Sequence, residues 1–162
     1  MQEKLFIKNM NESKLRTLIT EYLQQAKLMQ LATVSNGNPW VCSVWYGFDD
    51  DLNIYFFSAT NRRHSLEISN DNRVAGAMAL PQTPQDQPRG LQFEGKAKRL
   101  TDEADITHAR STYEGRIFDA ETINKFMAHQ ERPHSFYRIV PSKFVLFDAV
   151  NFPENSRQEY KL

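Results

Sequence analysis

Three consecutive side chains, Arg62, Arg63 and His64, have the chemistry to bind a phosphate group. A strand should end in the short polar run before them, and a helix should begin at their position. The first turn of a helix has unpaired backbone N–H groups and the positive end of the helix dipole. Guanidinium groups add charge-assisted hydrogen bonds, and the hydroxyl groups of Ser58 and Thr60 could donate further ones. The cluster therefore predicts a phosphate site, with a solvated helix start as the alternative.

The segment Ser43-Val-Trp-Tyr46 could either fill a core or lie along a planar ligand. Successive side chains of a strand point to opposite faces, so Val44 and Tyr46 should share one face and Ser43 and Trp45 the other. Taken alone, the segment favours a role in the core.

Other kinds of chemical site are not expected. The four histidines lack the spacing of metal ligands, and a single cysteine, Cys42, excludes an intramolecular disulfide and a cysteine metal cluster. Cys42 lies in an apolar strand, which predicts a buried and unreactive thiol. There is no Walker loop, no Gly-x-Gly-x-x-Gly and no Gly-x-Ser-x-Gly. We therefore expect no metal, no nucleoside triphosphate site and no Rossmann-type dinucleotide site.

The charges of the chain balance, with 20 Lys and Arg against 20 Asp and Glu. Such a chain has no overall field to attract nucleic acid or an anionic membrane. No apolar run approaches the roughly 18 residues of a membrane helix, and the first residues lack the pattern of a signal peptide. These features predict no nucleic-acid partner, no membrane and a cytoplasmic location.

The apolar pattern predicts the elements that position these residues. Residues 15–23 have the apolar spacing of a helix, which Asn11 or Ser13 could cap. Strands are expected over 28–35, 40–48, 54–58, 73–80, 91–100, 135–140 and 143–148. Further helices are expected over 63–69, about 101–114 and 120–129. The segment 81–90 holds three prolines and should be a loop, and the polar residues after Pro153 should form a mobile tail.

Two glycines occupy positions that call for special backbone geometry. Gly37, within Asn36-Gly-Asn-Pro39, should take a positive φ in the turn that joins the first two strands into a hairpin. Gly95 interrupts the fifth strand and should mark a bulge or a bend.

Six or seven short strands without a regular βαβ alternation predict a mainly β fold, an antiparallel barrel with peripheral helices. With 162 residues, the chain has the length of one domain. We expect a single domain over 1–162, made of an N-terminal helix (1–27), the barrel (28–148) and the tail (153–162).

A series of short motifs in order along the chain has a known parallel. The motifs are Leu31-Ala-Thr-Val34, Gly37-Asn-Pro39, Val44-Trp-Tyr46, Ile54-Tyr-Phe56, Arg63-His64, Asn72-Arg-Val74 and Phe93-Glu-Gly-Lys-Ala97. Over about 27–148 the chain resembles the pyridoxamine 5′-phosphate oxidase-like, FMN-binding split-barrel superfamily, above all its small bacterial members whose substrates are unassigned. The resemblance implies a homodimer of split barrels with one FMN in each of two clefts at the interface.

The resemblance also implies roles for particular residues. Arg63 and His64 stand where the family has Arg-Lys for the flavin phosphate, and Arg62 stands at the neighbouring serine position. Ser58 matches the hydroxyl position after the third strand. The strand from Ser43 to Tyr46 matches the one whose backbone lies along the isoalloxazine edge.

Two departures from the family pattern affect the substrate. The family glutamine that contacts flavin from the partner is replaced by Gly90, while Gln92 lies two residues further on. Gln92 and Arg89 are therefore expected to reach toward the partner's flavin. The Arg-x-His element of the oxidase's C-terminal substrate segment has no clear match, so oxidation of pyridoxamine phosphate itself is not expected.

The expected function is that of an FMN-dependent oxidoreductase or reductase, in which the protein positions the flavin and tunes its surroundings. Two alternatives remain open: a non-catalytic flavin or haem protein that stores or senses its ligand, and a reductase that uses deazaflavin F420 in the same cleft.

Overall fold

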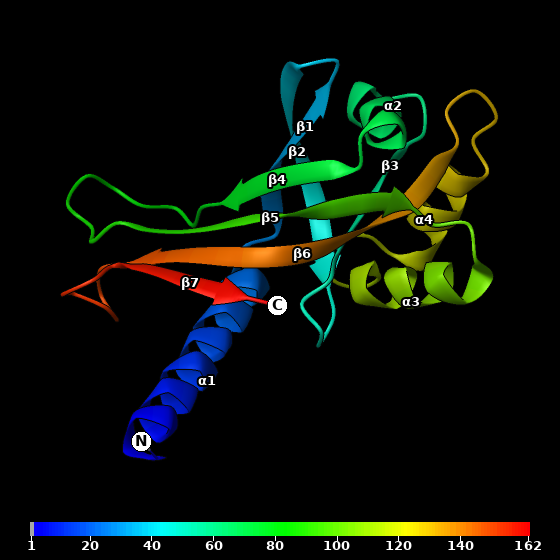
Figure 1. Ribbon diagram of the computed structural model, residues 1–162. Coiled ribbons are helices and arrows are strands. Elements are labelled where there is room, and N and C mark those ends of the chain that lie inside the picture. Colours follow the sequence, from blue (N-terminus) through cyan, green and yellow to red (C-terminus); the bar gives the residue numbers. More distant parts are fainter. Residues whose placement is uncertain (1) are drawn as a thin grey trace.

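A computed structural model describes the chain from residue 2 to residue 162, with side chains described from Asn11 onward. The helices are α1 (Gln2–Gln25), α2 (Arg63–Asn70), α3 (Glu103–Tyr113) and α4 (Ala120–Met127). The strands are β1 (Leu28–Ser35), β2 (Asn38–Phe48), β3 (Ile54–Ala59), β4 (Arg73–Met78), β5 (Arg89–Arg99), β6 (His134–Asp148) and β7 (Arg157–Lys161). The strands form the body of the molecule and the helices lie at its periphery (Figure 1).

The described strands form one antiparallel sheet that closes into a ring. Along the sheet the order is β3-β2-β1-β4-β5-β6-β7, and β3 also pairs with β6. Six strands thus complete the barrel, and β7 is added to an edge of β6. Closure pairs backbone groups that would otherwise form free sheet edges. The predicted mainly β antiparallel barrel is confirmed, with seven strands within the described residues.

Both glycine predictions are confirmed. The hairpin between β1 and β2 turns at Asn36 (φ 50°) and Gly37 (φ 77°), and two positive φ values give a turn that matches the twist of the paired strands. The register between β5 and β6 shifts between Glu94 and Gly95. A Cβ atom on Gly95 would lie 2.4 Å from the carbonyl oxygen of Val140, so the close approach of the two strands requires glycine here.

One strand replaces two that the sequence predicts. The expected strands 135–140 and 143–148 are continuous as β6. Pro141 does not end the strand, because it lies opposite Gly95 at the bulge. A proline is tolerated where the regular ladder of hydrogen bonds is already interrupted.

The predicted mobile tail is also wrong, because residues 157–161 form β7. Strand β3 pairs with β6 only as far as Ile54 opposite Ile139. Beyond that point one edge of β6 is left without a partner, and β7 pairs with residues 143–147 of this edge. Alternating intermediate and exposed residues in β7 match its position at the outside of the sheet.

Asn11 and Ser13 do not cap the first helix, because α1 already begins at Gln2. The first 25 residues contain no glycine or proline, the two residue types that most strongly interrupt a helix. Although α1 has 24 residues, no helix of residues 2–162 is both long and apolar enough to cross a membrane.

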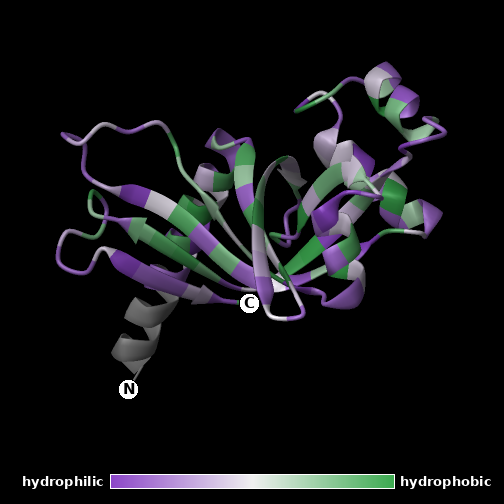
Figure 2. Ribbon diagram, turned by 90° about the horizontal axis from the view of Figure 1, so that it is seen from above, coloured by the Kyte–Doolittle hydropathy of each residue, from purple (hydrophilic) through white to green (hydrophobic). Residues whose placement is uncertain are grey.

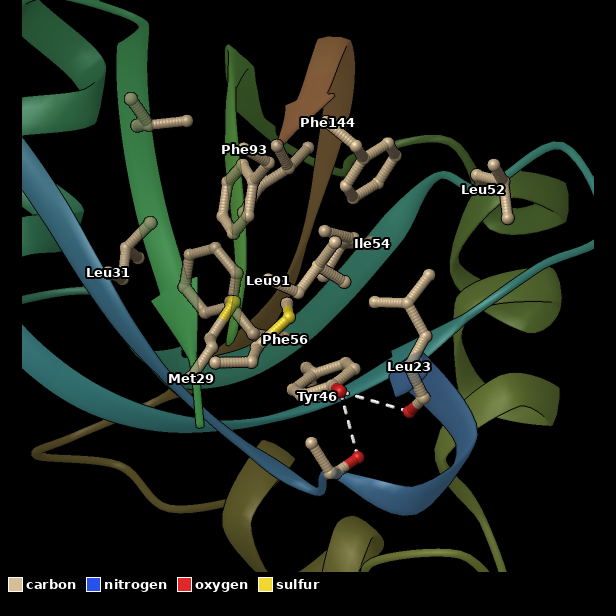
Figure 3. Close-up of a cluster of buried hydrophobic side chains, with 14 of the residues drawn as sticks. Leu23, Met29, Leu31, Tyr46, Leu52, Ile54, Phe56, Leu91, Phe93 and Phe144 are labelled. Carbon is tan, nitrogen blue, oxygen red and sulfur yellow. Dashed lines mark hydrogen bonds between the residues drawn. The ribbon is translucent and has the colours of Figure 1, made fainter. Parts of the chain in front are cut away.

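The main core fills the inside of the barrel. Along β1, β4 and much of β5, buried residues alternate with more exposed ones, so bands of hydrophobic and hydrophilic residues follow one another (Figure 2). This alternation turns one face of each of these strands inward. The inward side chains, many of them fully buried, include Met29, Leu31, Phe56, Leu91, Phe93 and Phe144 (Figure 3). Ile19 and Leu23 of α1 complete this core from one end.

The end of α1 is tied to the barrel by two side chains. The Tyr46 hydroxyl donates toward the carbonyl oxygens of Leu23 and Ala26, at 2.9 and 2.8 Å (Figure 3). The Arg116 guanidinium donates to the carbonyl oxygens of Leu23, Gln24 and Ala26, at 2.7, 3.2 and 2.8 Å. The last carbonyl groups of a helix have no hydrogen-bond partner within the helix. The donors from Tyr46 and Arg116 supply the partners that these carbonyl groups lack.

A second apolar cluster covers the outer face of β3. Its buried residues are Tyr55, Phe57, Leu100, Ala109, Tyr113, Ile123 and Phe136. Helices α3 and α4 supply part of this cluster, and each begins with an aspartate cap, Asp102 and Asp119. The outer side of β3 is therefore filled by protein, whereas Val41, Ser43 and Trp45 on the outer side of β2 are exposed.

Candidate functional site

The helix predicted to hold the phosphate site is α2, which contacts β1, β2 and β5 at one end of the barrel (Figure 1). The chain turns from β3 into α2 through two bonds to Ala59: its carbonyl oxygen accepts from the Arg62 N–H at 3.2 Å and from the Ser65 hydroxyl at 2.9 Å. The Thr60 N–H donates to the carbonyl oxygen of Pro133 at 3.0 Å, so the segment before β6 lies beside this turn.

The start of α2 differs from the starts of α3 and α4. Asp102 and Asp119 accept hydrogen bonds from the backbone of the first turns of those two helices. The N-cap of α2 is Arg62, which makes no such side-chain bond, and its first turn has no acidic residue. A cation at this end opposes the helix dipole, whereas a bound anion would satisfy both the N–H groups and the charge. The residues present therefore fit a phosphate group.

Arg62 and Arg63 are both exposed. The Nε of Arg63 donates to Oε1 of Glu67 at 2.8 Å, and its guanidinium lies 4.3 Å from the ring centre of Trp40. The side chain of Arg63 remains 48% exposed. Arg63 is thus held in place by its own chain without being buried.

His64 lies in a different environment from the two arginines. It is buried, and its Nε2 lies 2.8 Å from the Ser58 hydroxyl oxygen. Burial, followed by the positive charge of Arg62, lowers the pKa of His64. At neutral pH the imidazole is therefore uncharged, so Arg62 and Arg63 supply the positive charge of the cluster.

A second histidine, His134, lies near the start of α2. His134 pairs with Ala59 across the β3–β6 ladder, and its ring lies between Phe57 and Phe126, with centroid distances of 5.2 and 4.8 Å. Burial lowers the pKa of His134, and the charge of Arg62 contributes to this shift. Only the pairing of two strands far apart in sequence brings His134 here, so no local motif could have identified it.

The strand 43–46 alternates as predicted. Val44 and Tyr46 are buried in the main core, whereas Ser43 is exposed and Trp45 is 47% exposed on the outer face. Only the side chains of Ser43 and Trp45, together with the backbone, are thus available to a planar ligand outside the barrel.

Gln92 lies on the same outer face as Ser43 but is not next to it. The strand registers form a row in which Ser43 pairs with Gln30, Gln30 with Ala77, and Ala77 with Gln92. Three strand spacings of about 4.8 Å place Gln92 roughly 14 Å from Ser43. A shallow pocket of about 400 Å³ lies over Gln30, Ala77 and Gln92 of this row, without reaching Ser43. A ligand at Ser43 would therefore have to span about 14 Å to reach Gln92 of the same chain.

Arg89 is engaged within its own chain. Its guanidinium pairs with the buried Asp148 at 3.3 Å and lies 6.0 Å from the ring centre of Tyr22. The neighbouring loop is fixed too, since the side chain of Gln82 bonds to both the backbone N–H and the carbonyl oxygen of Arg89. The expected reach of Arg89 toward a partner would require this ion pair to open.

Cys42 shows no sign of nucleophilic chemistry. Burial, followed by the negative charge of Glu67, raises the pKa of its thiol to about 11. The thiol is therefore protonated at neutral pH, and the thiolate is the reactive form. Within the part of the chain that the structure describes, no group of three His, Cys, Asp or Glu side chains could hold a metal ion.

Comparison with known proteins shows which family the sequence of this chain matches. A family model described as pyridoxamine 5′-phosphate oxidase matches residues 15–145. The chain is similar to the UPF0306 protein PM1958 of Pasteurella multocida, with 25% identity over 138 residues that cover 83% of this chain and 89% of the relative.

Solved structures show the same fold at low sequence identity. A heme binding protein from Mycobacterium smegmatis superimposes with a TM-score of 0.68 and 16% identity, covering 86% of this chain but only 55% of that longer chain. A FAD-binding protein from Mesorhizobium loti superimposes with a TM-score of 0.58 and 20% identity, covering 79% and 88% of the two chains. With the family match extending over most of its length and its strands closed into the same kind of barrel, the chain belongs to the pyridoxamine 5′-phosphate oxidase-like split-barrel superfamily.

Proposed function

We propose that this chain binds FMN and acts as a flavin-dependent oxidoreductase. The observation that carries the proposal is the start of α2, where Arg62 replaces an acidic cap and Arg63 follows it, in a chain of this family. A phosphate there would complete the hydrogen bonds of the helix start. A bound flavin would supply hydride and electron transfer, chemistry that amino-acid side chains lack.

The phosphate would be held by Arg62, Arg63 and the first backbone N–H groups of α2. Ser58, His64 and Thr60 would add uncharged donors. Because the Ser58 hydroxyl and His64 Nε2 contact each other, a phosphate that binds either group would have to share it with the other.

The ring of the flavin would lie outside β2. Ser43 and Trp45 face that side, and the backbone of this strand would lie along the ring edge. The backbone N–H and carbonyl groups of Tyr46 are already bonded, to the Lys27 carbonyl oxygen and to Arg116. An exposed tryptophan can cover a planar ligand by stacking. The buried side chains of Val44 and Tyr46 would act by fixing the strand.

The proposal includes a homodimer. The outer face of β1, β2 and β4 exposes large apolar residues, Leu28, Val41 and Trp45, next to small ones, Ala75 and Ala77. Exposed apolar residues gathered on one face of a sheet favour an interface with another protein surface. A second copy would bring its Gln92 toward a flavin outside β2. The cytoplasmic location stays a prediction from the sequence.

Haem binding is the second candidate function. It is favoured by the structural similarity to the heme binding protein of Mycobacterium smegmatis. In that case the protein would store or sense its ligand without redox turnover.

The test is the absorbance spectrum of the purified chain, followed by heat release and mass measurement of any bound molecule. The proposal predicts flavin bands, the mass of FMN, and bleaching of the flavin by NADH, NADPH or another donor. A Soret band would support haem binding instead, and the mass of F420 would identify a deazaflavin protein. A flavin that no donor reduces would argue for a passive binder.

A further inference from the structure

The guanidinium of Arg63 is fixed on two sides. Its Nε is bonded to Oε1 of Glu67 at 2.8 Å, and its Cζ lies over the ring of Trp40, 4.3 Å from the ring centre. Glu67 is itself fixed, because the Thr33 hydroxyl on β1 donates to its other oxygen, Oε2. A chain of contacts therefore runs from the barrel wall through Glu67 to Arg63.

Glu67 is a buried carboxylate, with 9% of its side chain exposed, whereas nearly half of the Arg63 side chain is exposed. The hydrogen bond from Thr33, followed by that from Arg63, lowers the pKa of Glu67, so this carboxylate is charged at neutral pH. A buried charge is stable only when it is paired and hydrogen-bonded. The interior half of the pair thus anchors the exposed half.

The contacts leave one edge of the guanidinium free. The Nε of Arg63 bonds to Glu67, one face of the guanidinium packs on Trp40, and the two Nη groups make no hydrogen bond to the described residues. The two Nη groups together form an edge that can bind phosphate through two parallel hydrogen bonds. An arginine that is already ordered loses less freedom when a ligand binds, which increases affinity by about threefold to tenfold.

We propose that Trp40 and Glu67 are positioning residues, which hold Arg63 so that its Nη edge binds the phosphate of the ligand. This inference rests on the phosphate site of the proposed function and adds to it the parts that order the site. Trp40 supports the face of the guanidinium, and Glu67, fixed by Thr33, supports its Nε. Neither residue needs to touch the ligand.

Trp40→Ala is the first variant to test, because Trp40 is 41% exposed and its loss should not prevent folding. We expect it to weaken FMN binding by about threefold to tenfold, measured by flavin fluorescence on the full chain freed of bound ligand. Riboflavin, which lacks the phosphate, should bind to Trp40→Ala as it does to wild type. Equal FMN affinity of wild type and Trp40→Ala would overturn the inference.

A double-mutant cycle separates positioning from direct contact. If Trp40 acts through Arg63, then Trp40→Ala should have no further effect on FMN affinity in an Arg63→Ala background. Additive losses would mean that Trp40 contacts the ligand directly, which would overturn the inference. If the wild-type chain binds no FMN, both the proposed function and this inference fail. If Arg63→Ala weakens binding and Trp40→Ala does not, only the inference fails.

Two variants of Glu67 test the other support. Glu67→Gln retains an oxygen that accepts from Arg63 Nε, and should bind FMN within about twofold of wild type, whereas Glu67→Ala should lose about as much affinity as Trp40→Ala. Tighter binding by Glu67→Ala would show that the carboxylate only repels the phosphate, contrary to the inference.

Discussion

Replacing Arg116 with methionine should lower the free energy of unfolding by about 3 kcal/mol, because four backbone carbonyl groups lose a charged donor. The Tyr46 hydroxyl would still bond two of them, those of Leu23 and Ala26. The guanidinium bonds to three carbonyls at the end of α1 and also to the carbonyl oxygen of Tyr46 at 3.3 Å. It also lies 5.6 and 5.5 Å from the ring centres of Tyr46 and Phe48. Methionine keeps much of the apolar contact and removes the hydrogen bonds. Urea unfolding followed by circular dichroism measures the change.

Arg99→Met is the matched control for Arg116→Met. Arg99 is exposed and makes one side-chain hydrogen bond, from its Nε to the Ser135 hydroxyl at 3.0 Å. Its replacement should cost at most about 0.5 kcal/mol, as for most surface substitutions. If Arg116→Met and Arg99→Met lowered the free energy of unfolding equally, a specific role of Arg116 in holding α1 would be contradicted.

The second large effect concerns ligand affinity. Arg63→Ala should weaken FMN binding by at least about tenfold, since one charge-assisted hydrogen bond contributes about 1.5–3 kcal/mol. Loss of Arg63 also leaves the charge of Glu67 unpaired near the phosphate, which adds to the weakening. Isothermal titration calorimetry with FMN measures the affinity, and circular dichroism checks that the variant is folded.

Arg110→Ala is the control for this variant. Arg110 makes the same kind of pair on α3, with its Nε 2.8 Å from Oε2 of Glu114 four residues later. Because α3 lies away from the start of α2 (Figure 1), FMN affinity should be unchanged in Arg110→Ala. A similar loss in both variants would attribute the effect to general destabilisation.

Local patterns predicted most of the barrel, because they depend on neighbouring residues. The hairpin at Gly37 and the bulge at Gly95 follow from the backbone freedom of glycine, and both are present. Up to residue 100, the strand limits agree with those predicted to within two residues. In these segments propensity, turn chemistry and burial all favour the same structure.

The end of the barrel could not be predicted from local patterns. β7 exists because β6 extends beyond β3 and offers a free edge. Its one apolar side chain, Tyr160, gives no apolar alternation that could predict a strand. Likewise, Pro141 can lie in β6 only because Gly95 is opposite. Both the presence of β7 and the position of Pro141 within β6 depend on pairing between segments that are far apart in sequence.

The phosphate cluster was visible in the sequence, whereas its supports were not identified there. Arg63 and Glu67 are four residues apart on one helix, a spacing that indicates an ion pair and could have revealed the anchor. The position of Trp40 beside Arg63 depends on how α2 packs on the barrel, which no spacing indicates. The burial of His64 against Ser58 has the same origin.

A comparison of FMN with riboflavin on the wild-type chain tests the phosphate site at α2 most directly. The two flavins differ only in the phosphate, so the ratio of their dissociation constants reports its contribution. FMN should bind at least about tenfold more tightly than riboflavin, and added salt should reduce the difference. Equal affinities for the two flavins, or no binding of FMN, would contradict a phosphate site at the start of this helix.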